Sequence, residues 1–471
     1  MATLVAPMGG AATTQIRELS NATANESVWM KAFDAPAAAV GDFDGDGHAE
    51  IVAHNDNQYV YVLSTKEARV LAEFKPPYPS GWGARPLNDP AVADVDNDGR
   101  LEIVVATSAA YVCVYEYDPS QSTATSFKFL QVWCKRMDTY DPTEAGADAG
   151  VWVEDVTGDG KAEIFSQTEE QGLFCFNYDG TVRWSTSDWG GNAGPTVADL
   201  NGDGKKEAVF FGDGGEVKAF DAATGVAKWT FYSNKHVWPA SIPVSGAVGD
   251  LETDGKKEIV FIARQATHTD DYRKNHFMLF VLNHDGTLRW KAQPTWGNPL
   301  SYTHPIIHDV DGDGKKEIIA EDWNTIGHKP GAWEKLGPAN VFAYNADGTL
   351  RWRTTFDASW SNDDLALADV DGDGHQDVLA IGFAGGTEGV WYLDARNGVQ
   401  KQHIPIYGWT PLRGVIAGDF DKSGDTEFAV PVHKTDKGGG YVFFDTGVAC
   451  NIAFGGWQNP TPCSPRTGSS S

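Results

Sequence analysis

Short apolar segments alternate with acidic turns along almost the whole chain. A run of small apolar residues such as 90–93 stands before each acidic turn, and a β-rich run such as 102–106 follows it. An alternating segment comes next, as in 341–345, and an Asp-Gly turn then leads into a segment that carries Trp, as in 347–352. Period-two alternation and Asp-Gly between apolar runs are typical of strands and hairpins. Each repeat therefore predicts four antiparallel strands, named A to D in chain order.

The acidic turns form a nine-residue repeat of the type Asp-x-Asp-x-Asp-Gly-x-x-Glu. It occurs eight times, at 42–50, 94–102, 155–163, 199–207, 250–258, 309–317, 369–377 and 419–427. A four-stranded period of about 50 residues is typical of a propeller blade, whereas separate sandwich domains would need about 100 residues each. We therefore predict an all-β fold, a β-propeller of four-stranded antiparallel blades. Eight blades are favoured, and seven are the alternative if one repeat is irregular.

The repeats predict one propeller domain over residues 26–449, between an N-terminal extension (1–25) and a C-terminal tail (450–471). The last repeat has a poorly marked fourth strand, whereas the N-terminal run 26–33 resembles a D strand. We expect this N-terminal strand to close the last blade, because closure removes exposed sheet edges. The segment after Cys450 is then expected to pack outside the ring.

Each acidic repeat places oxygen ligands at positions 1, 3, 5 and 9 and Gly at position 6, which suits calcium, a hard cation with six to eight oxygen ligands. Several structural calcium ions, up to about eight, are therefore expected; acidic surface turns without metal are the alternative. Repeats with Thr157, Asn201 or Ser423 carry one charge less and are expected to bind more weakly. The candidate ligands are Asp42, Asp44, Asp46, Glu50, Asp94, Asp96, Asp98, Glu102, Asp155, Thr157, Asp159, Glu163, Asp199, Asn201, Asp203, Glu207, Asp250, Glu252, Asp254, Glu258, Asp309, Asp311, Asp313, Glu317, Asp369, Asp371, Asp373, Asp377, Asp419, Asp421, Ser423 and Glu427.

These loops resemble the FG-GAP or VCBS repeats of calcium-binding, integrin-α-like propellers, over nearly the whole chain. Similar loops occur in fungal and bacterial propeller lectins and in propeller-fold polysaccharide lyases, including rhamnogalacturonan and rhamnose-glucuronate lyases. The resemblance implies a calcium-binding propeller, but the motif is not specific for one function. Segment 221–229 is also similar to quinoprotein dehydrogenases, although the chain has no adjacent cysteine pair.

In a four-stranded blade the A–B and C–D turns lie on one face of the ring, and the D–A and B–C loops lie on the other. The acidic A–B turns have constant length, whereas the D–A and B–C loops vary, as functional loops on a rigid scaffold do. The D–A and B–C loops carry many Trp and Arg residues. Trp stacks on sugar rings and Arg binds carboxylates, so these loops are suited to an acidic polysaccharide. The alternative is that part of the Trp residues only pack between blades. The candidate substrate-binding residues are Trp82, Arg85, Trp189, Trp238, Trp296, Trp323, Trp360, Trp409 and Arg413.

A polysaccharide lyase is the favoured function. Cleavage next to a uronic acid by β-elimination needs a base for the proton alpha to the carboxylate and a cation to offset its charge. The alternatives are a non-catalytic carbohydrate-binding lectin and an integrin-like adhesion or interaction propeller, in which the same loop histidines are solvated. The candidate catalytic residues, from neighbouring long loops, are His236, His268, His304, His328, Tyr272, Tyr302 and Arg264.

The composition indicates where such a protein works. A net charge of -28 argues against nucleic acid, and no apolar run reaches the roughly 18 residues that span a membrane. The five cysteines predict a Cys113–Cys134 pair across neighbouring strands, a Cys450–Cys463 staple in the tail and a buried free thiol at Cys175. Sequons at 21–23 and 25–27 are compatible with a secreted glycoprotein, although residues 1–7 are no signal peptide as written. We expect an extracellular monomer.

Overall fold

The structure of the protein is a computed structural model. It describes residues 16–18, 39–54, 59–66, 69–77, 90–107, 109–137, 150–168, 172–188, 190–191, 193–212, 214–236, 240–242, 245–265, 277–293, 304–322, 339–356, 365–384, 387–406, 410–411, 414–434, 438–449 and 452–453.

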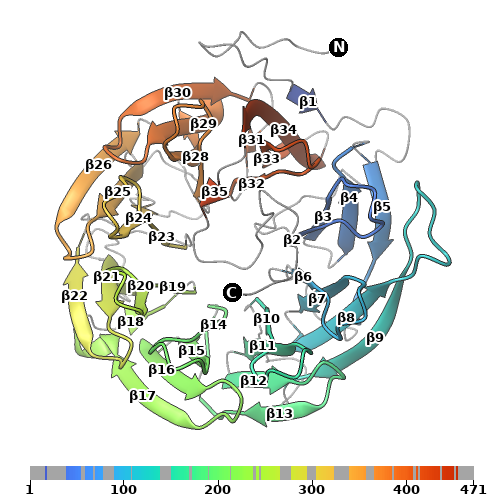
Figure 1. The fold of residues 1–471 in the computed structure, drawn as a ribbon, viewed down its shortest axis with the longest axis horizontal. Coiled ribbons are helices and arrows are strands. Elements are labelled where there is room, and N and C mark those ends of the chain that lie inside the picture. The colour runs from blue at the N-terminus through green and yellow to red at the C-terminus, as the bar shows by residue number, and fades with distance from the viewer. Residues whose placement is uncertain are drawn as a thin grey trace, which may run out of the picture.

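The described strands form eight antiparallel sheets arranged as a ring (Figure 1), so the predicted all-β propeller is confirmed. Seven sheets are blades in which strands A to D follow one another from the centre to the rim. Blades one to three contain β2 (Ala39–Gly41), β3 (Glu50–His54), β4 (Val60–Ser64), β5 (Arg69–Phe74), β6 (Ala91–Ala93), β7 (Glu102–Ala106), β8 (Tyr111–Tyr117), β9 (Phe129–Arg136), β10 (Trp152–Glu154), β11 (Glu163–Thr168), β12 (Gly172–Phe176) and β13 (Val182–Ser185).

Blades four to seven continue the same order around the ring. Blade five has an added short strand, β18, which pairs with its B strand. These blades contain β14 (Thr196–Ala198), β15 (Glu207–Phe211), β16 (Glu216–Asp221), β17 (Ala227–Tyr232), β18 (Ala240–Ser241), β19 (Ala247–Gly249), β20 (Glu258–Gln265), β21 (Phe277–Leu282), β22 (Leu288–Ala292), β23 (Ile306–His308), β24 (Glu317–Asp322), β25 (Ala339–Tyr344), β26 (Leu350–Phe356), β27 (Ala366–Ala368), β28 (Asp377–Ala384), β29 (Thr387–Asp394) and β30 (Gln400–Pro405). The only helix in the described ranges is the short 3-10 turn η1 (Ser233–Lys235).

The last sheet is built differently. Its A, B and C strands are β32 (Ile416–Gly418), β33 (Asp425–Lys434) and β34 (Gly438–Ala449), and β31 (Thr410–Pro411) also pairs with β33. The strand next to β34 is β1 (Ile16–Glu18), with Ile16 opposite Phe444. Seven blades thus have the predicted succession of four strands, not the favoured eight, because among the described residues no later segment returns along β34. Residues 26–33, the expected closing strand, lie outside the described ranges, so that closure stays a prediction.

The segment after Cys450 does not simply lie outside the ring as expected. Strand β35 (Ile452–Ala453) pairs with β27, the innermost strand of blade seven. The physical reason is that an A strand has one unpaired edge facing the centre of the ring, and this edge can accept another short strand.

The core lies between neighbouring blades rather than within one sheet. Every B and C residue of blade three is buried, because these strands have a blade on each face. One buried cluster joins β2–β4 of the first blade to Phe420, Ala429 and Tyr441 of the last sheet. The backbone N–H of Ala49 also donates to the carbonyl of Phe420 at 2.7 Å. The two ends of the repeat array are therefore joined by side-chain packing and a backbone hydrogen bond.

A tryptophan on the D strand links each of five blades to the next one. The indole N–H donates to a carbonyl in the next blade's C–D turn at 2.8–3.0 Å. The ring also lies against the glycine of that turn, where a Cβ would come within 2.8 Å of the indole. This contact explains part of the high Trp content as structural. The pairs are Trp133 with Tyr178, Trp184 with Ala222, Trp229 with His284, Trp290 with Ala346, and Trp352 with Ala395.

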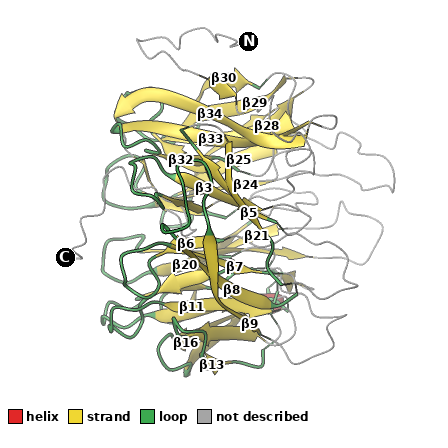
Figure 2. Cartoon of the chain, turned by 90° about the vertical axis from the view of Figure 1, so that its right-hand side faces the viewer, coloured by secondary structure: helices red, strands yellow, loops and turns green. Residues whose placement is uncertain are grey.

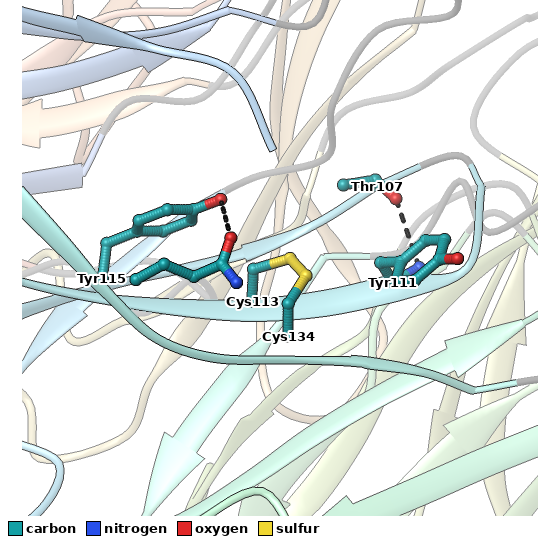
Figure 3. Close-up of a disulfide and its surroundings, with 6 residues drawn as sticks. Thr107, Tyr111, Cys113, Tyr115 and Cys134 are labelled. Carbon is teal, nitrogen blue, oxygen red and sulfur yellow. Dashed lines mark hydrogen bonds between the residues drawn. A yellow bond between two sulfur atoms is a disulfide. The ribbon is translucent and has the colours of Figure 1, made fainter. Parts of the chain in front are cut away.

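The predicted cysteine pair is confirmed. Cys113 and Cys134 are opposite each other on β8 and β9 of blade two and form a disulfide (Figure 3). Tyr115 and Tyr111 flank Cys113 on β8, and the Tyr115 hydroxyl donates to Gln131 at 3.4 Å. Cys175 is a buried free thiol, as expected. Cys450 and Cys463 lie outside the described residues.

Candidate functional site

All eight acidic repeats lie at the turn between strand A and strand B. Each turn starts directly after the three-residue A strand. It ends on the first residue of the B strand, as in 42–50 between β2 and β3, except in the last loop, where β33 already begins at Asp425. The side view shows the described loops gathered mainly at one side of the ring, on the left (Figure 2). The repeats therefore occupy equivalent places around the ring.

The backbone of each acidic loop is held by its first residue. The glycine at position 6 has φ between 83° and 91° in every copy, a left-handed conformation that favours glycine. Its N–H donates to Oδ2 of the aspartate at position 1 at 2.8–3.2 Å in all eight loops. The first aspartate thus shapes the turn, and in six loops its Oδ1 also accepts a backbone N–H from position 3, 4 or 5.

The acid at position 9 uses its two oxygens in a similar way. One oxygen accepts the N–H of position 2 at 2.6–3.3 Å in all eight loops. This acid is the first or nearly the first residue of the buried B strand; Glu50 and Glu102, for example, are each only 3% exposed. Burial, together with the negative charge of the nearby aspartates, raises the pKa of Glu50 and Glu102 to about 8. A cation that binds there would supply positive charge beside these buried carboxylates, which favours their charged form.

Five loops bring three carboxylate oxygens within 4.8 Å of one another. The oxygens Asp42 Oδ1 and Asp96 Oδ1 are buried and have no hydrogen-bond partner in the described part of the chain. Clustered carboxylates and unpartnered buried oxygens fit a hard divalent cation, which takes oxygen ligands and supplies their missing positive charge. The five sets are Asp42, Asp44 and Glu50; Asp94, Asp96 and Glu102; Asp309, Asp311 and Glu317; Asp369, Asp371 and Asp377; and Asp419, Asp421 and Glu427.

Neighbouring loops are also hydrogen-bonded to one another. The N–H of position 8 in one loop donates to the carbonyl of position 2 in the preceding loop at 2.7–2.9 Å. A loop that is ordered by a bound ion thus supports the next loop around the face. The pairs are Ala49 with Phe420, Ala162 with Val95, Lys257 with Leu200, and Lys316 with Leu251.

The structure describes only part of the predicted catalytic set. His268, Tyr272, Tyr302 and His328 lie outside the described residues. Arg264 is described through its backbone, which pairs with Phe277 and Ser241 in blade five. His304 is partly exposed just before β23, and His236 is exposed directly after η1, in the D–A connection of blade four.

His236 lies next to a lysine and two phenylalanine rings. Its ring stacks on Phe231 at 5.5 Å between ring centres and meets the edge of Phe280 at 5.9 Å. Lys291 Nζ, from the D strand of blade five, lies 3.5 Å from His236 Nδ1. Partial burial lowers the pKa of His236 below its usual range, and Lys291 and Lys235 lower it further. Lys291 could not be identified from the sequence, because only the fold brings the D–A connection of blade four next to the D strand of blade five.

We expect replacement of Lys291 to raise the pKa of His236. Because the folded-state pKa lies below the unfolded value, His236 contributes stability above pH 6.5, and this stability is lost as pH falls through the lowered pKa. Lys291→Met should bring the His236 titration, followed by NMR, closer to the ordinary histidine value near 6.5. The same titration in Lys228→Met is the control, and an unchanged His236 midpoint in Lys291→Met would contradict the assignment.

All nine predicted substrate-binding residues, Trp82, Arg85, Trp189, Trp238, Trp296, Trp323, Trp360, Trp409 and Arg413, lie outside the described residues. Their role stays a prediction. Basic residues of the D strands do contact the acidic loops. Arg351, which precedes Trp352 in the sequence, lies 3.4 Å from Glu317. The position of these basic residues against the loops could not be read from the sequence.

Comparisons with known proteins agree with this fold. A family model described as an FG-GAP-like repeat matches residues 33–105 and 155–210. The Vibrio cholerae biofilm matrix protein Bap1 is similar in structure, with a TM-score of 0.56, 17% identity and 88% of each chain covered. Sqt1 from Saccharomyces cerevisiae has a TM-score of 0.55 at 11% identity, over 89% of this chain and 97% of that chain.

A further similar structure is a quinohemoprotein alcohol dehydrogenase from Comamonas testosteroni, with a TM-score of 0.54, 11% identity, and 91% of this chain and 77% of that chain covered. At such identities the likeness concerns the fold alone. A search of curated protein sequences gave no match. No helix in the described ranges has the length and apolar character needed to cross a membrane. The chain is a β-propeller that carries FG-GAP-like repeats.

Proposed function

We propose that this protein is a secreted, calcium-stabilised β-propeller that binds acidic polysaccharide. The observation that carries the calcium part is the repeated convergence of carboxylate oxygens at the A–B turns, five times within 4.8 Å. Buried oxygens that have no hydrogen-bond partner among the described residues support the same assignment in three of these loops, at Asp42, Asp96 and Asp419. In this proposal the cations order one face of the ring, and the opposite face carries recognition.

The carbohydrate part of the proposal rests on the sequence of the D–A and B–C loops. These loops are rich in Trp, Tyr, His, Arg and Lys although the whole chain carries a net charge of -28. Aromatic rings bind sugar faces, and Arg binds carboxylates in a bidentate manner. The disulfide Cys113–Cys134 supports an oxidising location such as the cell exterior. The similarity to a protein described as part of a biofilm matrix is in keeping with this location.

Binding is tested with polysaccharides that differ only in charge. We expect the calcium-loaded protein to bind uronate-containing polymers, measured by calorimetry, and to bind neutral polymers of similar length at least tenfold more weakly. Trp409→Ala and Arg413→Ala test the predicted face, and Val226→Ala, at an exposed position of a C–D turn on the opposite face, is the control. Equal binding to neutral polymers, or no binding to either, would reject the carbohydrate proposal.

Lyase activity is the second candidate, because His236 and Lys291 supply a base and a cation at one place. In β-elimination, neutral His236 takes the proton alpha to the uronate carboxylate and Lys291 offsets the charge of that carboxylate. The electron pair of the broken C–H bond forms a C=C bond as the glycosidic oxygen leaves from the β-carbon and takes up a proton. The Nδ1–Nζ distance of 3.5 Å places both groups within reach of one sugar ring.

The elimination product absorbs in the ultraviolet, so turnover is measured directly. We expect His236→Ala to lower the rate at least about 100-fold, the usual contribution of a general base. His284→Ala is the matched control, because His284 lies in a C–D turn on the other face and its carbonyl still accepts from Trp229. If no uronate polymer yields an unsaturated product, the binding function stands without catalysis.

A further inference from the structure

Each of the seven complete blades has one extra residue in its D strand. The pairing between strands C and D skips one D residue in every blade, which makes a β-bulge at the same place. For example, Ala343 pairs with Trp352 and Tyr344 pairs with Leu350, so Arg351 is the extra residue. Bulges change the direction of a side chain. The bulge residues in chain order are Leu71, Val132, Arg183, Lys228, Arg289, Arg351 and Lys401.

In blades three to seven the bulge residue is basic, and it contacts the position-9 acid of its own blade. Arg289 and Arg351 place Nη1 3.4 Å from Glu258 Oε1 and Glu317 Oε1. Lys401 Nζ lies 2.8 Å from Asp377 Oδ1. Arg183 lies 3.9 Å from Glu163, and Lys228 forms an ion pair with Glu207.

Three of these cations also reach the acid at position 3 of the loop. Arg289 and Arg351 lie 2.5 Å from Glu252 and Asp311, and Lys401 lies 3.0 Å from Asp371. Lys401 additionally lies 2.8 Å from Asp373 at position 5. The ammonium group of Lys401 thus contacts three of the four side chains that would hold a calcium ion in this loop.

In blades one and two the bulge residue is apolar. Leu71 is buried, and Val132 is 50% exposed. Within the described residues, the Oε1 atoms of Glu50 and Glu102 have neither a hydrogen bond nor an ion pair. The buried oxygens Asp42 Oδ1 and Asp96 Oδ1 also lack a hydrogen-bond partner there. The basic groups near these loops contact other oxygens than those of the position-9 acid: Lys422 is 2.5 Å from Asp42 Oδ2, and Lys66 is 3.0 Å from Asp46. Arg100 forms an ion pair with Asp98 at position 5 of the second loop.

We infer that the D-strand bulge residue decides which acidic loops require a divalent cation. The loops 42–50 and 94–102, with Leu71 and Val132, bind calcium tightly. The loops of blades three to seven carry a built-in positive charge and bind it weakly. The inference rests on the proposed calcium role, and it leaves the loop 419–427 unassigned, because the side chains of β1 are not described.

The physical reason is competition for the same oxygens. A guanidinium or ammonium group on the position-9 carboxylate supplies the charge that the ion would supply, and it repels a second cation. Two like charges about 4 Å apart repel by about 4 kcal/mol at an effective dielectric constant of 20. The number of carboxylates is then a poor guide to affinity, because loops 309–317 and 369–377 have a complete acidic set and also a competing cation.

Blades two and six offer a matched pair for the test, because both loops carry Asp at positions 1, 3 and 5 and Glu at position 9. The reciprocal variants are Val132→Arg and Arg351→Val, and Val132 is exposed enough to accept a longer side chain. The number of calcium ions and their Kd are measured by calorimetry and native mass spectrometry on the chelated and reloaded full chain. Thermal unfolding verifies that each variant is folded.

We expect Val132→Arg to lose one tight ion, with that site weakened about 1,000-fold, because about 4 kcal/mol of repulsion corresponds to about three powers of ten in Kd. Arg351→Val should gain one tight ion, and Lys401→Met is a second gain variant if Arg351→Val does not fold. Val226→Arg adds the same charge at an exposed turn of blade four. It should change neither the number of bound calcium ions nor their Kd. Wild type that binds no calcium would reject the calcium proposal itself. If wild type binds calcium, but the number of tightly bound calcium ions is the same in Val132→Arg and in both gain variants, only the role of the bulge residue is rejected.

Discussion

Removal of calcium is expected to lower the Tm of this protein by at least about 10 °C. A ligand that binds only the folded state stabilises it by about 4 kcal/mol at a free concentration of 1,000 times its Kd. Two such sites, in the loops 42–50 and 94–102, contribute about 8 kcal/mol, and each kcal/mol corresponds to at most a few degrees in a chain larger than 200 residues. The measurement is calorimetric or optical unfolding with calcium and with chelator.

The loss of stability has a structural cause at the ring closure. The loop 42–50 donates the Ala49 N–H to Phe420 of the last sheet, so disorder in this loop weakens the junction between the first and last repeats. Without the ion, several carboxylate oxygens remain within 4.8 Å of one another. Magnesium is the control ion, because it requires tighter octahedral geometry and keeps its waters. An unchanged Tm after complete chelation would contradict the proposal that calcium stabilises the fold.

Truncation of Trp352 is expected to cost about 3–5 kcal/mol of stability, the usual range for Trp→Ala in a core. Trp352 is only 8% exposed, and it joins blade six to blade seven. Its indole packs on the glycine at 398, and its Nε1 donates to the Ala395 carbonyl at 2.8 Å. The variant removes this packing and leaves a buried carbonyl without its donor. Denaturant unfolding of wild type and Trp352→Ala measures the difference.

Two further variants separate the packing from the hydrogen bond. Trp352→Phe keeps much of the apolar contact but removes the indole hydrogen bond. Its free energy of unfolding should therefore fall by about 1 kcal/mol more than the smaller ring alone would cause. Gly398→Ala should destabilise without any change in Trp352, since φ is 70° and the added Cβ would lie 2.5 Å from the indole. A Trp352→Ala variant within 1 kcal/mol of wild type would contradict the role of this contact.

The identity of the repeat could be predicted from local signals in the sequence. The A–B turn is specified by residues within nine positions of one another, with glycine where φ must be positive and carboxylates where N–H groups need acceptors. The order of four strands follows from period-two patterns and Asp-Gly turns, which also act over short distances. Cys113 and Cys134 could be paired because their strands are consecutive.

Other features depend on contacts between residues that are distant in sequence. His236 and Lys291 come together because the D–A connection of blade four lies next to the D strand of blade five. The pairing of β35 with β27, and the incomplete last sheet, depend on which edge remains open once the ring is assembled. The contact of Lys401 with Asp371 and Asp377 depends on a one-residue bulge that turns this side chain toward the loop.

The sequence by itself therefore determined the unit of this protein: a four-stranded blade with an acidic A–B turn, because short-range backbone and turn chemistry specify that unit. Only the tertiary structure decided how the units are joined and which acidic turns already contain a positive charge. These properties depend on strand register, in which a shift of a single residue changes the direction in which a side chain points.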